Sequence, residues 1–222
     1  TFSVIAKDAA GNTDTTPPSY TWIITTDKPT VTLTTAATSP TNAAFTVTAN
    51  FTKSVTGLEE GEITVTNGKA SSLSGSGSSY TFTVTPTTDG PVTVQIPANK
   101  AQDSAGNGNS ASDPLSVTYD HTAPNTTITS NPTNPSNSDS AVFNFISNET
   151  PSTFECQIDS KEWVPCTSPT SYSSLPDGSH TFSVIAKDAA GNTDTTPPSY
   201  TWIITTDKPT VTLTTAATSP TN

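Results

Sequence analysis

The sequence predicts an all-β protein built from tandem antiparallel β-sandwich domains, and three observations lead to this prediction. Residues 1–42 recur without a single change as residues 181–222. Apolar and polar residues alternate along short segments, whereas no segment has the periodicity of an amphipathic helix. Turn-forming pairs such as Asn67-Gly68 separate these segments.

The repeat indicates a modular array. Position 1 recurs at position 181, so the internal period is 180 residues. This period is too long for a solenoid, whose repeats span about 20–45 residues. It suits two domains of about 90 residues each, which is within the usual size range of a domain. We expect about seven short strands in each of these domains.

The alternation places the strands. In residues 45–51 the odd positions are apolar and the even positions are polar, as expected for a strand with one face in a core and the other in solvent. The same pattern recurs in residues 80–85, 182–186 and 200–204. These segments are the predicted core strands.

Short linkers that contain proline mark the domain boundaries, because such linkers form extended junctions. They occur at Asp27-Lys28-Pro29, at 120–124 and at 207–209. The predicted order is a partial domain of a second type at 1–27, a complete first-type domain at 28–120, a complete second-type domain at 121–207, and the first strand of another first-type domain at 208–222.

Composition argues against several classes of function. The net charge is -11 and all eight basic residues are lysines, so the chain has little means of binding nucleic acid. No apolar run is long enough to span a membrane. Hydrophobic residues make up only 31% of the sequence, and no nucleophile, phosphate-loop or zinc motif is present. We therefore expect no catalytic activity and no certain cofactor.

The two cysteines indicate a disulfide. Cys156 and Cys166 lie on two short apolar runs separated by the polar turn 159–162, so a hairpin would place them nearly opposite each other. A metal site and two free thiols are the alternatives, although no further cysteine or nearby histidine supports a metal. A disulfide would place the chain in an oxidising, extracytoplasmic environment.

Several segments resemble bacterial immunoglobulin-like repeats. The first domain resembles one group of these repeats in residues 31–42, 45–51, 61–68 and 80–86, and the second resembles modules of very long bacterial surface proteins in residues 125–130, 154–159, 165–169 and 175–184. The resemblance implies Greek-key sandwiches and a role as a stalk, adhesin or matrix component. Since such modules serve many proteins, it defines the fold better than the function.

Three related loops are candidate calcium sites. The sequence Asp-Ala-Ala-Gly-Asn occurs at 8–12 and 188–192, and Asp-Ser-Ala-Gly-Asn occurs at 103–107, each before a last strand. In such a sandwich this loop lies at the same end as the incoming linker, so carboxylate and carbonyl oxygens could converge on Ca²⁺. The alternative is a metal-free turn, which Asp, Gly and Asn also favour. The candidate ligands are Asp120, Asp188 and Asn192 at one junction, and Asp27, Asp103 and Asn107 at the other.

The remaining acidic residues and histidines that could form a site give weaker indications of function. Glu59, Glu60 and Glu62 form the densest acidic cluster, for which a solvated loop is the default interpretation because catalysis would need two carboxylates in one pocket. We expect His121 and His180 to be surface residues rather than ligands or bases.

The leading hypothesis is a structural segment of an extracellular bacterial surface protein that acts as stalk, fibre or sheath. Its predicted partners are neighbouring repeats of the same chain and other copies of itself, since Thr-rich edge strands with few charges are poorly protected against pairing. Two alternatives remain open. The domains could be adhesive modules that bind a glycan or a protein, or accessory domains of a secreted polysaccharide-active enzyme.

Overall fold

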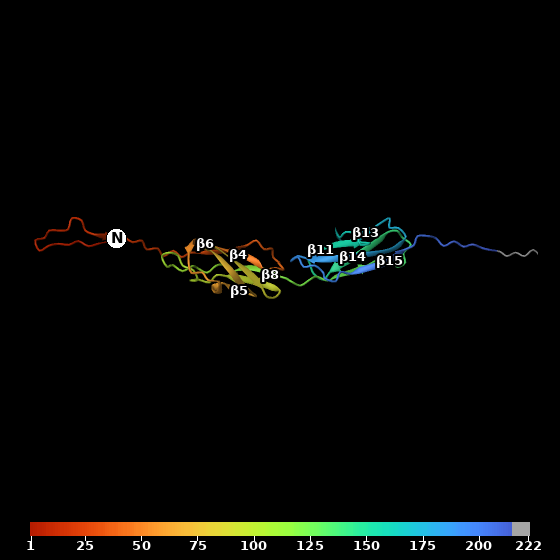
Figure 1. Ribbon diagram of the computed structural model, residues 1–222, viewed down its shortest axis with the longest axis horizontal. Helices are drawn as coiled ribbons and strands as arrows, with labels where there is room; N and C mark the ends of the chain where they lie inside the picture. The colour runs from red at the N-terminus through yellow and green to blue at the C-terminus, as the bar shows by residue number, and fades with distance from the viewer. Residues whose placement is uncertain (215–222) are drawn as a thin grey trace, which may run out of the picture. The chain divides into compact units, whose positions relative to one another are not determined.

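The structure is a computed structural model that describes residues 1–214 of the chain (Figure 1). Residues 1–39 and 43–119 form one compact unit, and residues 40–42 form the other unit together with the chain from residue 120 onward. The described residues contain strands, turns and one 3-10 helix, Glu60–Glu62, and no α-helix. No helix in this part of the chain is long and apolar enough to cross a membrane. The predicted all-β fold is confirmed.

The first unit contains a sandwich of two three-stranded antiparallel sheets. Neighbouring strands in each sheet are joined by antiparallel backbone hydrogen bonds. One sheet has the order β3 (Val31–Thr35), β4 (Phe45–Val55), β6 (Gly68–Pro86), and the other has the order β5 (Thr64–Thr66), β7 (Gly90–Gln95), β8 (Leu115–Tyr119).

The core of the first sandwich is mainly aliphatic. Along β4 the apolar positions predicted to face inward are buried, and the intervening Thr and Asn residues face outward or lie at the boundary. Val47, Val84 and Val94 are each fully buried, and Phe82 lies among them. Because alternate residues of a strand point to opposite faces, the alternation in the sequence is sufficient to place this core.

The second unit contains a sandwich of one three-stranded and one four-stranded antiparallel sheet. The smaller sheet has the order β13 (Thr170–Tyr172), β10 (Ala141–Ser147), β9 (Thr126–Ser130). The larger sheet has the order β12 (Val164–Cys166), β11 (Ser152–Ile158), β14 (Gly178–Asp188), β15 (Ser199–Ile204).

The core of the second sandwich is mainly aromatic. Phe143 stacks on Phe182 with 4.0 Å between ring centroids, and it meets Trp202 edge-on at 5.3 Å. All three side chains are fully buried. Aromatic side chains bury roughly 150–250 Å² each, so this cluster supplies much of the apolar burial in a small domain.

The N-terminal segment forms a hairpin of its own. Strands β1 (Phe2–Ser3) and β2 (Ser19–Tyr20) pair only with each other. Every residue from 1 to 28 is exposed except the half-buried Pro17. The last repeat, predicted at 208–222, has no strand in its described part, and residues 215–222 lie outside the described residues.

Candidate functional site

The loop at 188–192 is a closed turn held by its aspartate. One carboxylate oxygen of Asp188, Oδ1, accepts hydrogen bonds from the backbone N–H groups of Gly191 at 2.7 Å and Asn192 at 2.8 Å. The other oxygen, Oδ2, accepts one from the Asn192 side chain at 2.8 Å. Gly191 has a φ of 98°, a conformation that glycine adopts without steric cost. The turn therefore forms from local contacts alone.

The loops at 8–12 and 103–107 repeat this geometry. Asp8 accepts from Asn12 through both backbone and side chain, at 2.8 Å and 2.7 Å. Asp103 accepts from Asn107 in the same way, at 2.9 Å through the backbone and 3.1 Å through the side chain. The Asn side chain is the largest cause that lowers the pKa of each of these two carboxyls, so both stay ionised at neutral pH.

In the second unit a carboxylate cluster forms beside the loop. The side chains of Asp120, Glu149 and Asp188 each place a carboxylate oxygen within 4.8 Å of the others, and Asp188 is buried. The Asn192 side chain donates to the backbone carbonyl of Asp120 at 2.9 Å. Within residues 1–214 this is the one such group of acidic, histidine or cysteine ligands that could hold a metal ion.

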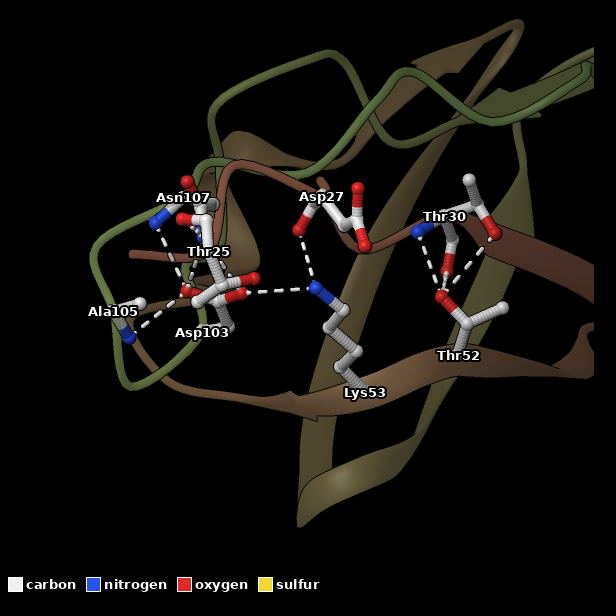
Figure 2. A network of polar contacts seen from close by, with 8 residues as sticks. All are labelled: Thr25, Asp27, Thr30, Thr52, Lys53, Asp103, Ala105 and Asn107. Atoms are coloured by element: carbon white, nitrogen blue, oxygen red, sulfur yellow. Dashed lines mark hydrogen bonds and ion pairs between the residues drawn. The ribbon is translucent and has the colours of Figure 1, made fainter. Parts of the chain in front are cut away.

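The corresponding place in the first unit contains a lysine (Figure 2). The amino group of Lys53 lies 3.4 Å from Oδ2 of Asp103 and also donates to the backbone carbonyl of Asp27. The Asn107 side chain donates to the backbone carbonyl of Thr25 at 3.1 Å. Thr25 thus takes the position that Asp120 has in the second unit. Asp27 takes part through its backbone carbonyl, which accepts the hydrogen bond from Lys53.

Hydrogen bonds around the two sites show that Lys53 and Glu149 are equivalent. The backbone N–H of Thr52 donates to the carbonyl of Thr30 at 2.9 Å, and that of Asn148 donates to the carbonyl of Asn125 at 3.1 Å. In return, the side chain of each donor residue accepts from the N–H of its partner, at 3.0 Å and 2.6 Å. Lys53 and Glu149 each follow directly after the paired residue. The same scaffold therefore carries opposite charges at one position.

Sequence reasoning did not single out Lys53 or Glu149. Neither belongs to a recurring motif, and each is remote in sequence from the loop it meets, Lys53 on β4 and Glu149 in the bend between β10 and β11. The signal that could have found them is the alignment of the two domain types, in which they occupy the same position. Of the predicted ligands, the structure brings Asp120, Asp188 and Asn192 together.

The predicted disulfide is confirmed. Cys156 and Cys166 are joined, with 5.8 Å between their Cα atoms. Their register is diagonal, because Cys156 pairs with Val164 and Cys166 pairs with Phe154 on the β11–β12 ladder. The bond ties the short edge strand β12 to β11 next to the buried aromatic core.

The prediction that His180 lies on the surface is wrong. Its ring packs on Trp202 at 5.6 Å, and its nitrogens contact the carboxylate of Asp159 and the carbonyl of Pro176, both at 2.8 Å. The Pro176 contact, with help from Asp159, raises the pKa of His180 although burial opposes this. His121 is exposed, as expected.

A buried aspartate that sequence reasoning did not single out joins β9 to the segment before β15. Asp194 accepts from the backbone N–H of Thr126 at 2.7 Å and from that of Thr196 at 2.8 Å. Burial alone would raise its pKa, but these hydrogen bonds outweigh burial and lower it. Asp14, its identical counterpart in the first copy, is exposed.

The three acidic side chains at 59–62 have different surroundings. Glu59 is exposed, Glu60 accepts a hydrogen bond from the backbone of Leu73 at 3.4 Å, and Glu62 forms an ion pair with Lys100 at 3.3 Å. These three side chains have separate partners or face solvent. The cluster is therefore a loop and 3-10 turn that ion pairing stabilises.

The family comparison agrees with this architecture. Residues 25–119 match the family described as Bacterial Ig-like domain. This match covers the whole first sandwich and its incoming linker. The match spans less than half of the chain, and the fold of both units is that of immunoglobulin-like β-sandwich domains. No curated protein matches it.

Three solved structures are similar to the chain at low identity and low TM-score. The fibronectin(III)-like modules of Clostridium thermocellum CbhA share 16% identity at a TM-score of 0.40, covering 78% of this chain and 93% of that one. Native alpha-2-macroglobulin from Escherichia coli, spanning domains MG0-NIE-MG1, shares 10% at 0.27, covering 78% and 71%. Dimeric latent PorU from Porphyromonas gingivalis shares 12% at 0.26, covering 81% and 20%.

Proposed function

We propose that this chain is a non-catalytic structural segment of an extracellular bacterial surface protein, in which repeated sandwich domains act as a stalk, fibre or sheath. The observation that carries the proposal is the identity of residues 1–42 with residues 181–222. Repetition of whole folded modules adds length to a protein without adding a new site. A stalk, fibre or spacer needs such added length, so this kind of repetition favours a mechanical or spacing role.

The disulfide and the family of the first domain support an extracellular place. Structural disulfides such as Cys156–Cys166 form and persist mainly in oxidising compartments. The match to the Bacterial Ig-like domain over residues 25–119 agrees with a bacterial source.

Accessibility on intact cells tests this proposal. Antibodies raised against the folded chain should label unpermeabilised cells that express the parent gene, and mild protease treatment of these cells should remove the label. A cytoplasmic enzyme as control should stay unlabelled and uncut. Labelling that requires permeabilisation would exclude a surface role.

One observation favours an adhesive module as a second candidate. Trp163 is 37% exposed and its neighbour Val164 is 50% exposed, both next to the disulfide on the second sandwich. An exposed aromatic with an apolar neighbour is a common element of binding surfaces. Trp163→Ala should then abolish binding on a glycan or matrix-protein array, whereas unchanged or absent binding favours the structural role.

Within the structural role, we propose that Asp120, Glu149 and Asp188 hold a Ca²⁺ ion. Each of these side chains offers a carboxylate oxygen, the kind of hard ligand that suits this cation. The first unit supports the idea by contrast, because the cation beside Asp103 is the ammonium group of Lys53. A site built for positive charge would thus contain a lysine in one domain and a metal ion in the other.

Calcium titration with thermal unfolding tests this second proposal. With a dissociation constant of about 10⁻⁴–10⁻³ M, as in extracellular modules, 10 mM Ca²⁺ should stabilise the second sandwich by roughly 1.4–2.7 kcal/mol. Glu149→Lys copies the first unit's arrangement and should abolish the shift. Lys53→Glu, the converse change, should leave it in place. Wild-type protein that unfolds at the same temperature in calcium and in chelator contains no such site.

A further inference from the structure

His180 on β14 has a hydrogen-bond acceptor at each of its two ring nitrogens. Nδ1 lies 2.8 Å from a carboxylate oxygen of Asp159, and Nε2 lies 2.8 Å from the backbone carbonyl of Pro176. Burial alone would raise the pKa of Asp159, but hydrogen bonds from His180 and Thr181 outweigh it and lower that pKa, so the carboxylate is ionised. A neutral imidazole has one N–H and the imidazolium ion has two. Both contacts are therefore satisfied only when the ring is doubly protonated.

The ring has little access to water that could replace a missing partner. The side chain of His180 is 6% exposed and lies on the indole of Trp202, with 5.6 Å between ring centroids. A neutral ring in this place would point a nitrogen lone pair at an acceptor oxygen 2.8 Å away. Buried polar atoms without a partner are costly, so the protonation state of the ring decides whether both contacts hold.

The charged groups that act on the ring come from the turn after β11. Asp159 attracts the second proton, and Lys161 on the same turn repels it. Asp177, beside Pro176, binds the segment after β15 instead, and β15 itself packs only an uncharged indole on the ring. The pKa of His180 is raised from its ordinary value of 6.5, first by the Pro176 carbonyl and then by Asp159, whereas burial and Lys161 act to lower it.

The Pro176 contact is the one that fails when the ring loses a proton to solvent. A hydrogen bond to a carboxylate is about twice as strong as one between neutral groups, so the remaining proton stays on Nδ1 and faces Asp159. Asp159 is also held in place by Thr181, whose backbone N–H donates to its other carboxylate oxygen at 3.0 Å and whose carbonyl accepts from its N–H at 2.9 Å. Nε2 is then left without a proton to donate to Pro176.

Pro176 belongs to the loop that crosses from the smaller sheet to the larger one. We call residues 173–177, between β13 and β14, the crossover loop. Within it the backbone N–H of Leu175 donates to the carbonyl of Asp139 at 3.0 Å. The carboxylate of Asp177 accepts from the backbone N–H of Thr206 at 2.9 Å and from its hydroxyl at 2.8 Å. The crossover loop thus connects the histidine to the segment that follows β15.

We propose that His180 is a pH-sensitive latch of the crossover loop. The doubly protonated ring holds the loop on the sandwich through Pro176, and loss of the Nε2 proton releases the loop together with the hold of Asp177 on Thr206. The stabilisation by the latch is fully present below pH 6.5 and is lost as the pH rises through the raised pKa of the folded state. The inference does not depend on the stalk proposal or on calcium.

Asp159→Asn separates the latch from the fold. Asn has the shape of Asp, and it can accept from Thr181 through its oxygen while its amide donates to Nδ1 of His180. A neutral ring with its proton on Nε2 then satisfies every contact. Asn also tolerates the φ of 52° at this position. The variant should therefore fold and keep the crossover loop closed at high pH. His121→Gln, a change at the exposed histidine, is the matched control and assigns the ring signals.

NMR of the ring nitrogens in the full chain tests the protonation state, because it distinguishes the imidazolium ion from each neutral tautomer. In wild type both nitrogens of His180 should carry protons at pH 6, and the neutral form should keep its proton on Nδ1. In Asp159→Asn the midpoint of the titration should fall by roughly 1–3 pH units, and the neutral form should keep its proton on Nε2. A neutral His180 in wild type at pH 6, or an unchanged midpoint in the variant, would overturn the latch.

Hydrogen exchange at pH 6 and pH 8.5 tests the release of the loop. After correction for the intrinsic rate, the protection of the Leu175 amide should fall by about tenfold in wild type and in His121→Gln, the factor equivalent to one pH unit. It should stay constant in Asp159→Asn. The Asn192 amide, which donates to Asp188 at 2.8 Å elsewhere in the same sandwich, is the internal reference. Equal falls at both amides, or no fall at Leu175, would contradict a local release.

Discussion

The two sandwiches have the same kind of fold, but their cores and their stabilising contacts differ. The first has an aliphatic core, no cysteine, and a Lys53–Asp103 ion pair beside its loop. The second has a stacked aromatic core, a disulfide on an edge hairpin, and Glu149 where the first has Lys53. The difference teaches that the alternating pattern determines the architecture, while the residues that fill it determine how each domain is stabilised.

The comparison extends to identical sequence. Residues 1–24 and 181–204 form the same hairpin, yet only the second copy lies in a core. Each substitution in residues 181–204 therefore has a control at the position 180 residues earlier. The predictions that follow use this property, from the largest expected effect to the smallest.

The largest effect should come from the aromatic core. Phe182→Ala removes a fully buried ring that stacks on Phe143 and should destabilise the second sandwich by about 3–5 kcal/mol. Phe2→Ala, the same change in the exposed copy, should alter stability by less than about 0.5 kcal/mol. Denaturant unfolding followed by tryptophan fluorescence measures both. Equal losses from the two variants would mean that both hairpins are buried in solution.

The next effect should come from the disulfide. Cys156→Ser with Cys166→Ser opens a loop with a sequence separation of 10 residues and should cost the second sandwich about 2–3 kcal/mol. The first sandwich contains no cysteine and should unfold at its original temperature in a calorimetric scan. Treating wild type with a reductant should reproduce the double substitution. An equal fall in the unfolding temperature of the first sandwich would contradict the prediction that the disulfide stabilises only the second sandwich.

The smallest effect should come from Asp194. Asp194→Ala leaves the buried N–H of Thr126 without its acceptor and should cost roughly 1–2 kcal/mol, while Asp14→Ala should cost almost nothing. The folded-state pKa of Asp194 is lowered below its ordinary value of 3.8. Its contribution is thus fully present above pH 3.8 and is lost as pH falls through the lowered pKa.

A pH series of thermal unfolding checks this sign. The gap in melting temperature between wild type and Asp194→Ala should be constant from pH 5 to 7 and should narrow in acid. A gap that widens in acid would mean that Asp194 is protonated in the folded protein.

Much of the fold was predictable because its signals are local. The alternation in residues 45–51 and 182–186 identified buried strands, since neighbouring side chains of a strand point to opposite faces. The turn at 159–162 brought Cys156 and Cys166 within bonding distance. The candidate site was only partly predictable. Lys53 on β4 and Glu149 in the bend between β10 and β11 lie far in sequence from the loops they meet, and no local sequence pattern predicts such long-range contacts.

The sequence by itself determined the hairpin. Its register and its aspartate-centred loop are the same in residues 1–24 and 181–204, because cross-strand pairing and turn chemistry are short-range interactions. Only the tertiary structure decided whether Trp22 or Trp202 is buried, and whether Asp14 or Asp194 becomes a buried acceptor. The physical reason is that apolar burial needs a second surface, and the residues of a hairpin cannot supply that surface for themselves.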